Sequence, residues 1–355
     1  MTKPLLQVSG LTKHYPIKGG LLGRQIASVQ AVTDVSFDLD AGETLAVVGE
    51  SGCGKSTMGR ALLRLHEPTA GQVTLGGQDI SGASPAELRD ARRRMQMIFQ
   101  DPFGSLNPRM TVRETVMEPI LLHGIASGEA AERLVLDLLA TVGLSPFHAG
   151  RYPHEFSGGQ RQRICIARAL STNPALIVCD EPVSALDVSV QAQVVNLLQD
   201  LQKAHGMAYV FISHDLAVVR HIADRVAVMY LGRVVEIADT ASLYAHPRHP
   251  YTRTLMQAAP RPDPAVRPVR EAVKGDMPSA LKMPSGCAFH SRCPMAQPIC
   301  SSQRPDLRKV QGGRHEVACH FAEDAIPATE VVVEKPVPAS LARRLAIMEQ
   351  AAAGA

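Results

Sequence analysis

The chain has 355 residues, of which 45% are apolar, enough for one large domain and a smaller one. Its formal charge of +3 is small for this length and gives no reason to expect nucleic-acid binding, which usually requires a clustered basic face. No segment approaches the roughly 18 consecutive apolar residues of a spanning helix, and no signal-peptide block opens the sequence. We therefore expect a cytosolic protein whose membrane association depends on partners.

Short apolar strands alternate with helical segments over residues 1–255, as in an α/β fold. The expected strands are 44–48, 97–99, 176–179, 209–212 and 226–230, and the expected helices are 57–65, 112–123, 129–142, 162–171 and 189–204. Runs that are apolar on both faces predict a covered, largely parallel sheet. Residues from about 100 to 170 predict a helical subdomain inserted into this core.

The composition changes after residue 255. Prolines predict a linker over 256–274, and a small extension with four cysteines follows over 275–322. The tail, 323–355, is expected to form a short helix or to stay disordered. The predicted domain organisation is thus a large α/β domain over 1–255, a linker, the extension and the tail.

A glycine-rich loop follows the expected strand 44–48 and precedes a helical run. Its residues are Gly49, Glu50, Ser51, Gly52, Cys53, Gly54, Lys55, Ser56 and Thr57. Glycines let successive N–H groups point at phosphate oxygens, and the positive end of the following helix adds to the attraction. The pattern in this context predicts an ATP site in which Lys55 reaches the β- and γ-phosphates and Ser56 ligates Mg²⁺. An ordinary strand–helix turn is the alternative.

Two acids follow the apolar strand 176–179. Acids at the carboxyl end of a strand lie beside the nucleotide in sheets of this kind. We expect Asp180 to hold Mg²⁺, directly or through water, and Glu181 to polarise the attacking water as general base.

A second anion-binding pattern lies ahead of the expected helix 162–171. It consists of Phe156, Ser157, Gly158, Gly159 and Gln160, and it offers a hydroxyl and glycine N–H groups at a helix N-terminus. Alone it predicts only a turn. About twenty residues before the Asp-Glu pair, it resembles the signature sequence of ABC-type ATPases, which implies a P-loop NTPase fold of ABC type.

The resemblance implies roles for further positions. Tyr15 resembles the aromatic residue that stacks on adenine, although the long segment 18–30 separates it from the phosphate loop. Gln100 resembles the glutamine that meets Mg²⁺ and senses the membrane subunits. Asp187 ends a loop, 184–187, similar to the one that crosses to the opposite subunit, and His214 resembles the histidine that contacts the γ-phosphate.

Three segments, 151–155, 181–187 and 249–252, are similar to the ATPase subunits of bacterial dipeptide and oligopeptide importers, as is the Cys-bearing extension. The resemblance implies a second homologous ATPase, two membrane permease subunits that dock near 101–108, and a peptide-binding protein that delivers the cargo. It implies a peripheral position at the cytoplasmic face of the inner membrane, and no nucleic acid. An importer for nickel, haem or another small solute, and a non-transport ABC ATPase, are the alternatives.

The seven cysteines form two groups. Cys287, Cys293, Cys300 and Cys319 have five, six and eighteen residues between neighbours, wider than most zinc pairs. The resemblance implies that they hold a [4Fe–4S] cluster; zinc and reduced structural thiols are the alternatives. Of the others, Cys53 is expected to react with alkylating reagents unless nucleotide protects it, and Cys165 and Cys179 are expected in the core.

Overall fold

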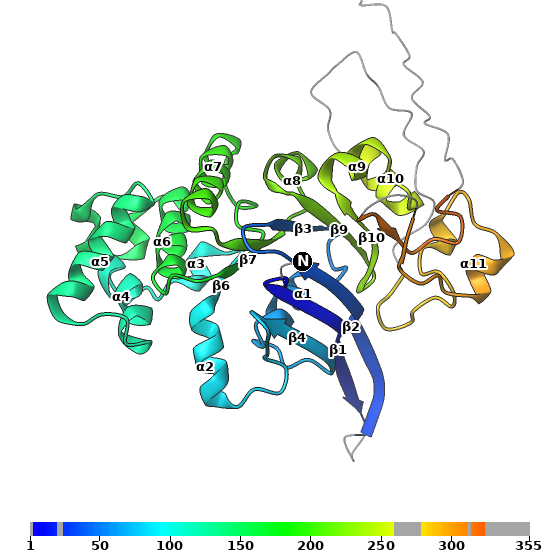
Figure 1. Cartoon of the computed structure of the whole chain (residues 1–355), viewed down its shortest axis with the longest axis horizontal. Coiled ribbons are helices and arrows are strands. Elements are labelled where there is room, and N and C mark those ends of the chain that lie inside the picture. Colours follow the sequence, from blue (N-terminus) through cyan, green and yellow to red (C-terminus); the bar gives the residue numbers. More distant parts are fainter. Residues whose placement is uncertain (1–2, 20–23, 259–277, 311–313, 324–355) are drawn as a thin grey trace, which may run out of the picture.

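The structure, a computed structural model, describes residues 3–19, 24–258, 278–310 and 314–323 (Figure 1). Most of the predicted linker, 259–274, and nearly all of the predicted tail, 324–355, lie outside these ranges. Within them, no helix combines the length and the apolar character that crossing a membrane requires.

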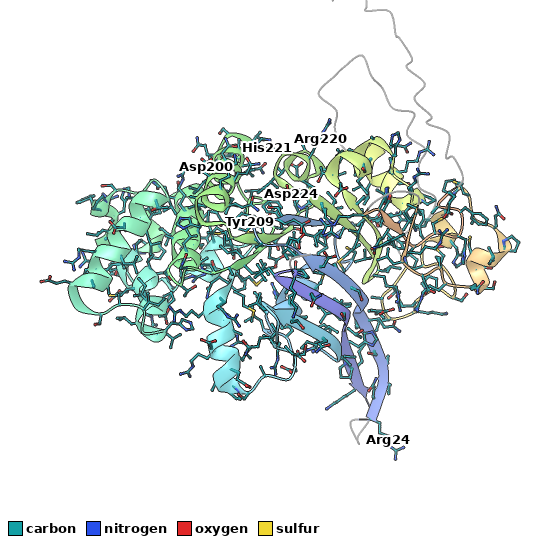
Figure 2. All side chains as sticks on the ribbon, in the orientation of Figure 1. Arg24, Asp200, Tyr209, Arg220, His221 and Asp224 are labelled. Carbon is teal, nitrogen blue, oxygen red and sulfur yellow. The ribbon has the colours of Figure 1, made fainter. Side chains whose placement is uncertain are left out.

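An eight-stranded sheet with the order β11-β12-β10-β9-β3-β8-β7-β6 forms the centre of the molecule. Its parallel strands are β3 (Thr44–Val48), β6 (Met95–Ile98), β7 (Leu176–Asp180), β8 (Ala208–Ile212) and β9 (Arg225–Tyr230). Every residue of β3, β7, β8 and β9 is buried, which confirms the expected covered sheet. The large, partly polar side chain of Tyr209, on β8, is also fully buried. Its hydroxyl donates to the Leu198 carbonyl at 2.9 Å (Figure 2).

A second, antiparallel sheet was not foreseen from the sequence. It has the order β2-β1-β4-β5 and consists of β1 (Leu6–Gly19), β2 (Arg24–Leu39), β4 (Ala70–Leu75) and β5 (Gln78–Asp79). The described parts of the segment that lengthens the spacing after Tyr15, 18–19 and 24–30, therefore belong to the paired strands β1 and β2. Alternating burial along these strands places one face against the helix α1 (Lys55–Leu62) in a shared core.

The helical subdomain follows β6 and lies on the opposite side of the molecule from the C-terminal extension (Figure 1). It contains α3 (Pro102–Ser105), α4 (Val112–Leu122), α5 (Gly128–Thr141), the 3-10 turns η1 (Pro146–Gly150) and η2 (Pro153–Glu155), and α6 (Gly158–Leu170). Reciprocal capping starts α4, where Thr111 and Glu114 each bond the other's backbone N–H. The expected helices 112–123 and 129–142 are thus confirmed to within one or two residues.

Further helices border the sheets. They are α2 (Pro85–Arg94), α7 (Val188–His205), α8 (Leu216–Ile222), α9 (Thr240–Ala245) and α10 (Pro250–Ala258). The helix α7 ends at Gly206, whose φ of 68° is the left-handed conformation that terminates many helices.

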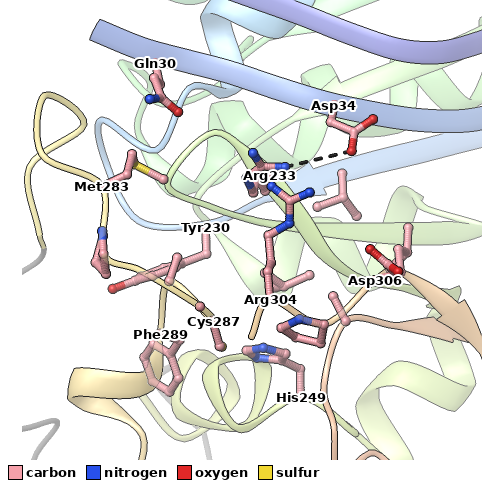
Figure 3. A pocket seen from close by; sticks show the side chains of 18 residues that line it. Gln30, Asp34, Tyr230, Arg233, His249, Met283, Cys287, Phe289, Arg304 and Asp306 are labelled. Atoms are coloured by element: carbon pink, nitrogen blue, oxygen red, sulfur yellow. Dashed lines mark ion pairs between the residues drawn. The ribbon is translucent and has the colours of Figure 1, made fainter. Parts of the chain in front are cut away.

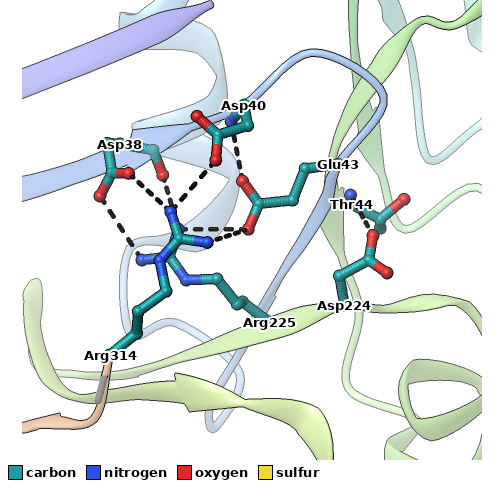
Figure 4. A network of polar contacts seen from close by, with 7 residues as sticks. All are labelled: Asp38, Asp40, Glu43, Thr44, Asp224, Arg225 and Arg314. Carbon is teal, nitrogen blue, oxygen red and sulfur yellow. Dashed lines mark hydrogen bonds and ion pairs between the residues drawn. The ribbon is translucent and has the colours of Figure 1, made fainter. Parts of the chain in front are cut away.

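The extension contacts the rest of the fold through strand pairing and through ion pairs. Its strands β11 (Arg308–Lys309) and β12 (Glu316–Val317) continue the sheet beyond β10 (Arg233–Asp239), and its short helices are η3 (His290–Arg292) and α11 (Pro298–Ser302). Arg314 bonds Asp38 at 3.3 Å and Asp40 at 3.2 Å, in a network that includes Arg225 (Figure 4). The extension therefore packs on the large α/β domain.

Candidate functional site

The glycine-rich loop connects β3 to α1 through a tightly confined backbone. A Cβ on Gly49 would lie 2.2 Å from the Met229 carbonyl oxygen, and one on Gly54 would lie 2.0 Å from the Ala31 carbonyl oxygen. Gly54 also has a φ of 104° immediately before the first residue of α1. Only glycine lacks the Cβ that these close contacts exclude, and only glycine readily adopts the positive φ of Gly54. Gly49 and Gly54 therefore fix the path of the loop.

Lys55, at the first turn of α1, is buried to 5% exposure and lies across the loop. Its ammonium group donates to the carbonyls of Gly49 at 2.8 Å and Glu50 at 3.1 Å. The side chain is thus held at the place where a phosphate oxygen would meet it, next to the helix N-terminus.

The loop opens onto a cavity of about 520 Å³, within the range of small-molecule sites. Among its lining residues are Ser51, Gly52, Gly54, Lys55, Ser56, Thr57, Gln100, Glu181 and His214. The structure therefore brings most of the predicted loop residues and all three predicted catalytic side chains to one cavity. Gly49, Glu50 and Cys53 belong to the loop but do not border the cavity.

Asp180 and Ser56 form the candidate magnesium site. The Ser56 hydroxyl donates to Asp180 Oδ1 at 2.6 Å, and burial raises the pKa of Asp180. Asp180 Oδ2 is buried without a hydrogen-bond partner among the described residues; its nearest cation is Arg60, at 3.7 Å. A hydroxyl and a carboxylate with a free oxygen fit Mg²⁺, which is usually held by one or two carboxylates together with phosphates and water.

Glu181 is the meeting point of the predicted catalytic residues. Its Oε2 accepts from Gln100 Nε2 at 2.9 Å and lies 3.2 Å from His214 Nδ1. The three side chains follow β6, β7 and β8, whose carboxyl ends adjoin because the strands are parallel neighbours. Glu181 has a φ of 47°, a strained conformation for a residue with a side chain, held by its N–H bond to the Ile212 carbonyl at 3.0 Å.

The signature residues lie at the N-terminus of α6, away from this cavity. Ser157 accepts from the Gln160 N–H at 3.4 Å, and Gln160 Oε1 accepts from the Ser157 N–H at 3.1 Å. A Cβ on Gly158 would lie 3.5 Å from Leu186, and one on Gly159 would lie 2.4 Å from Val190. The signature therefore packs beside the loop that ends at Asp187, an exposed residue directly before α7.

None of Ser157, Gly158, Gly159, Gln160 and Asp187 lines the phosphate cavity. Ser157 and Asp187 are instead exposed on the surface. The signature and Asp187 therefore lie on a surface separate from the cavity at the phosphate loop.

Tyr15 is not among the residues that line the cavity either. It pairs with Val29 across the β1–β2 hairpin, and its hydroxyl bonds His66 Nδ1 at 2.7 Å. Val29, Gln30 and Ala31 of β2 border the cavity in its place. The stacking of adenine on Tyr15 remains a prediction.

The sequence analysis missed residues that reach the cavity from distant parts of the chain. Leu231 and Gly232 follow β9, and Ala280 belongs to the extension. The Ala280 carbonyl accepts from the Gln30 N–H at 3.1 Å, and Gln30 also borders a second cavity of about 300 Å³ beside the extension (Figure 3). No local motif marks these positions, because only the tertiary fold brings them together.

Cys287, Cys293, Cys300 and Cys319 all border one small cavity of about 20 Å³ in the extension, which has room for about one water molecule. All four are free thiols, and burial raises the pKa of Cys293 and of Cys319 to about 11. In the described ranges, no three His, Cys, Asp or Glu side chains are gathered into a group that could hold a metal ion. The thiols share a cavity but, as arranged, do not form a coordination site.

The remaining cysteines are buried. Cys165 and Cys179 belong to the core, as expected. The structure argues against the expected reaction of Cys53 with alkylating reagents, because Cys53 is 1% exposed and burial raises the pKa of its thiol. A thiolate, the reactive form, is therefore disfavoured.

The fold and the site together define a P-loop ATPase of ABC type. The family described as "ABC transporter" matches residues 32–184, and that described as "Oligopeptide/dipeptide transporter, C-terminal region" matches residues 235–300. The chain is 55% identical to the probable peptide ABC transporter ATP-binding protein y4tS of Sinorhizobium fredii, over 92% of this chain and 93% of that one. The oligopeptide transport ATP-binding protein AppF of Bacillus subtilis is 53% identical, over 89% and 97%.

The chain belongs to the ABC transporter family of ATP-binding proteins and is an ATPase. Among solved structures it is similar to the dimeric, post-hydrolysis ATP-binding cassette MJ0796 bound to ADP and Pi, with a TM-score of 0.59 and 31% identity. That similarity covers 66% of this chain and 98% of the cassette. It therefore concerns the ATPase domain and does not span the full chain with its extension.

Replacing Lys55 by Ala should weaken ATP binding by about 10- to 100-fold, because a charged hydrogen bond is worth roughly 1.5–3 kcal/mol. Titration calorimetry with a non-hydrolysable ATP analogue measures the change. Lys203→Ala, on the exposed side of α7, is the control and should bind like the unmodified chain. Equal affinity of the two variants would contradict the assigned role of the loop.

Proposed function

We propose that the chain is the nucleotide-binding subunit of an importer that moves dipeptides or oligopeptides across the cytoplasmic membrane at the expense of ATP. The observation that carries the proposal is the match of residues 235–300 to the C-terminal region of oligopeptide and dipeptide transporters. The ATPase cassette alone is common to importers of many solutes. Relatives named as peptide or oligopeptide transport proteins match almost their whole length, extension included.

The geometry supports a division of labour among the site residues. Lys55 and the loop N–H groups hold the β- and γ-phosphates, and Ser56 and Asp180 hold Mg²⁺. Glu181 orients and deprotonates the attacking water, because its carboxylate lies at the cavity and is fixed by Gln100 and His214. His214 contacts the γ-phosphate, and Gln100 meets Mg²⁺ when nucleotide binds.

The separation of signature and phosphate loop supports a site shared by two ATPase subunits. In this arrangement Ser157, Gly158, Gly159 and Gln160 complete the site of a second homologous ATPase, and that subunit's signature completes the site described above. Tyr15 stacks on the adenine, and Asp187 contacts the opposite subunit. The dimeric form of the similar MJ0796 cassette is consistent with this pairing.

The helical subdomain provides a surface for membrane partners. Phe103 is 64% exposed on α3, where the guanidinium of Arg161 lies 3.6 Å from its ring centre. Leu121 and Leu122, at the end of α4, are also exposed. We assign this surface around residues 101–108 to two permease subunits, which hold the chain at the cytoplasmic face of the inner membrane while a separate binding protein delivers the peptide.

We propose the domain boundaries of the sequence analysis: residues 1–255 as the ATPase domain, 256–274 as the linker, 275–322 as the extension and 323–355 as the tail. The helix α10 continues to Ala258, three residues past the expected end of the ATPase domain. An importer for nickel, haem or another small solute remains the second candidate, because the ATPase site has the same chemistry whatever the cargo.

Replacing Glu181 by Gln should lower ATP turnover in the assembled complex by about 100-fold or more, the usual contribution of a general base, and leave ATP affinity within about twofold. Phosphate release and nucleotide titration measure the two quantities. Glu129→Gln is the control, since Glu129 is 93% exposed on α5 and pairs only with Arg133 among the described residues. Near-normal turnover of Glu181→Gln would remove it as the base.

ATP hydrolysis by the isolated chain should be slow and should rise with protein concentration, because two half-sites must meet. The measurement is the rate per subunit over a wide range of concentrations. A fast rate that is independent of concentration would contradict the shared site.

We further propose that Cys287, Cys293, Cys300 and Cys319 bind a [4Fe–4S] cluster that stabilises the extension. Their position around one buried, largely apolar cavity supports the proposal. Thiolates are the ligands of such clusters, and metal binding can supply folding energy to a short segment. The cavity must widen to admit the cluster.

Anaerobically purified chain should contain about four iron and four sulfide per subunit, as that cluster type requires. Cys300→Ser should lose most of the iron, whereas Cys179→Ser, in the core of the ATPase domain, should retain it. A colourless protein with one zinc per chain, or one without metal, would contradict the proposal.

A further inference from the structure

A long-range ion pair connects the extension to the phosphate loop. Arg292, the last residue of η3, donates to Glu50 Oε2 at 3.0 Å through one terminal nitrogen and to Glu50 Oε1 at 3.1 Å through the other. The two residues are 242 positions apart in the sequence. Glu50 is the residue after Gly49, so the contact reaches the loop itself.

The pair is held in a sheltered position by three packed rings. The rings of Tyr230, Tyr251 and Phe289 lie 4.6 to 5.4 Å apart between their centres, and the Arg292 guanidinium lies 5.9 Å from the rings of Tyr230 and Phe289. The Arg292 side chain is 10% exposed and that of Glu50 is 26% exposed. A bidentate ion pair between side chains that are so little exposed to solvent is stronger than an ordinary surface ion pair.

Glu50 in turn supports the groups that face the phosphates. Its carbonyl accepts from Lys55 Nζ at 3.1 Å and from the Cys53 N–H at 3.2 Å. Its own N–H donates to the Tyr251 hydroxyl at 2.8 Å. The orientation of this one residue therefore helps to fix both the lysine and the loop backbone.

The charge of Glu50 gives Arg292 a second effect. An unpaired carboxylate beside the loop would repel a bound triphosphate, and Arg292 neutralises it. Arg292 is also flanked by the Cys-lined cavity: Cys293 follows it, and the His290 N–H donates to the Cys287 carbonyl at 3.0 Å. The short 3-10 turn η3, of which Arg292 is the last residue, lies between Cys287 and Cys293.

We propose that Arg292 is a positioning residue for the phosphate loop: by holding and neutralising Glu50 it couples the C-terminal extension to ATP affinity. The proposal rests on the ATP site described above and adds a role for the extension. The proposed contacts with the nucleotide are left to Lys55 and the loop; Arg292 acts on these groups through Glu50.

The test compares the full-length chain with Arg292→Gln, Arg292→Lys and the double variant Arg292→Gln/Glu50→Gln. A non-hydrolysable ATP analogue is titrated by calorimetry, and kcat at saturating ATP is measured in the assembled complex. Arg314→Gln is the matched control, since Arg314 also ties the extension to the core but bonds Asp38 and Asp40 instead of the loop (Figure 4).

We expect Arg292→Gln to weaken binding by about fivefold or more, the lower end of typical couplings between sites, with kcat nearly unchanged. Arg292→Lys should retain part of the affinity. The double variant should recover the part of the loss that is caused by the unpaired charge, but not the part caused by the lost hold on residue 50. Arg314→Gln should bind like the unmodified chain.

Unchanged affinity of Arg292→Gln, an equal loss in Arg314→Gln, or no recovery in the double variant would each overturn the proposal. A purely structural role would lower the unfolding temperature of Arg292→Gln and of the double variant alike, without rescue of affinity. If Lys55→Ala also left affinity unchanged, the ATP site itself would be wrong; if only Lys55→Ala weakened binding, the error would concern Arg292 alone.

Discussion

The close approach of backbone to backbone at the phosphate loop is the constraint on which the rest of the structure depends. Gly49 passes the Met229 carbonyl and Gly54 passes the Ala31 carbonyl with no room for a Cβ. Because Met229 belongs to β9 and Ala31 to β2, the loop is clamped between the two sheets. The N-terminus of α1, with Lys55 and Ser56 in its first turn, takes its place from this clamp.

The order of the parallel central strands then determines which side chains meet at the cavity. β6, β7 and β8 adjoin, so the residues after them converge: Glu181 Oε2 accepts from Gln100 Nε2 and lies 3.2 Å from His214 Nδ1. The signature, by contrast, sits on α6 in the helical subdomain, where its capping bonds are satisfied within its own turn. The phosphate loop with its neighbouring catalytic residues, and the signature, therefore lie on different surfaces of one chain.

Sequence reasoning predicted the features that are local. The phosphate loop, the acids after β7 and the capped signature each combine a short motif with the strand or helix beside it. The β1–β2 hairpin was missed because its strands are half-exposed and alternate imperfectly, with several register shifts. The contacts of Ala280 with Gln30, and of Arg292 with Glu50, join segments more than 200 residues apart and leave no local signal.

The central claim is that the nucleotide site is one half of a shared site. The most direct measurement is an experimental structure of the assembled transporter carrying Glu181→Gln, with MgATP bound. The account predicts each γ-phosphate between Lys55 of one ATPase subunit and the Ser-Gly-Gly of the other. A nucleotide enclosed by Lys55 and Ser157 of the same chain would contradict it.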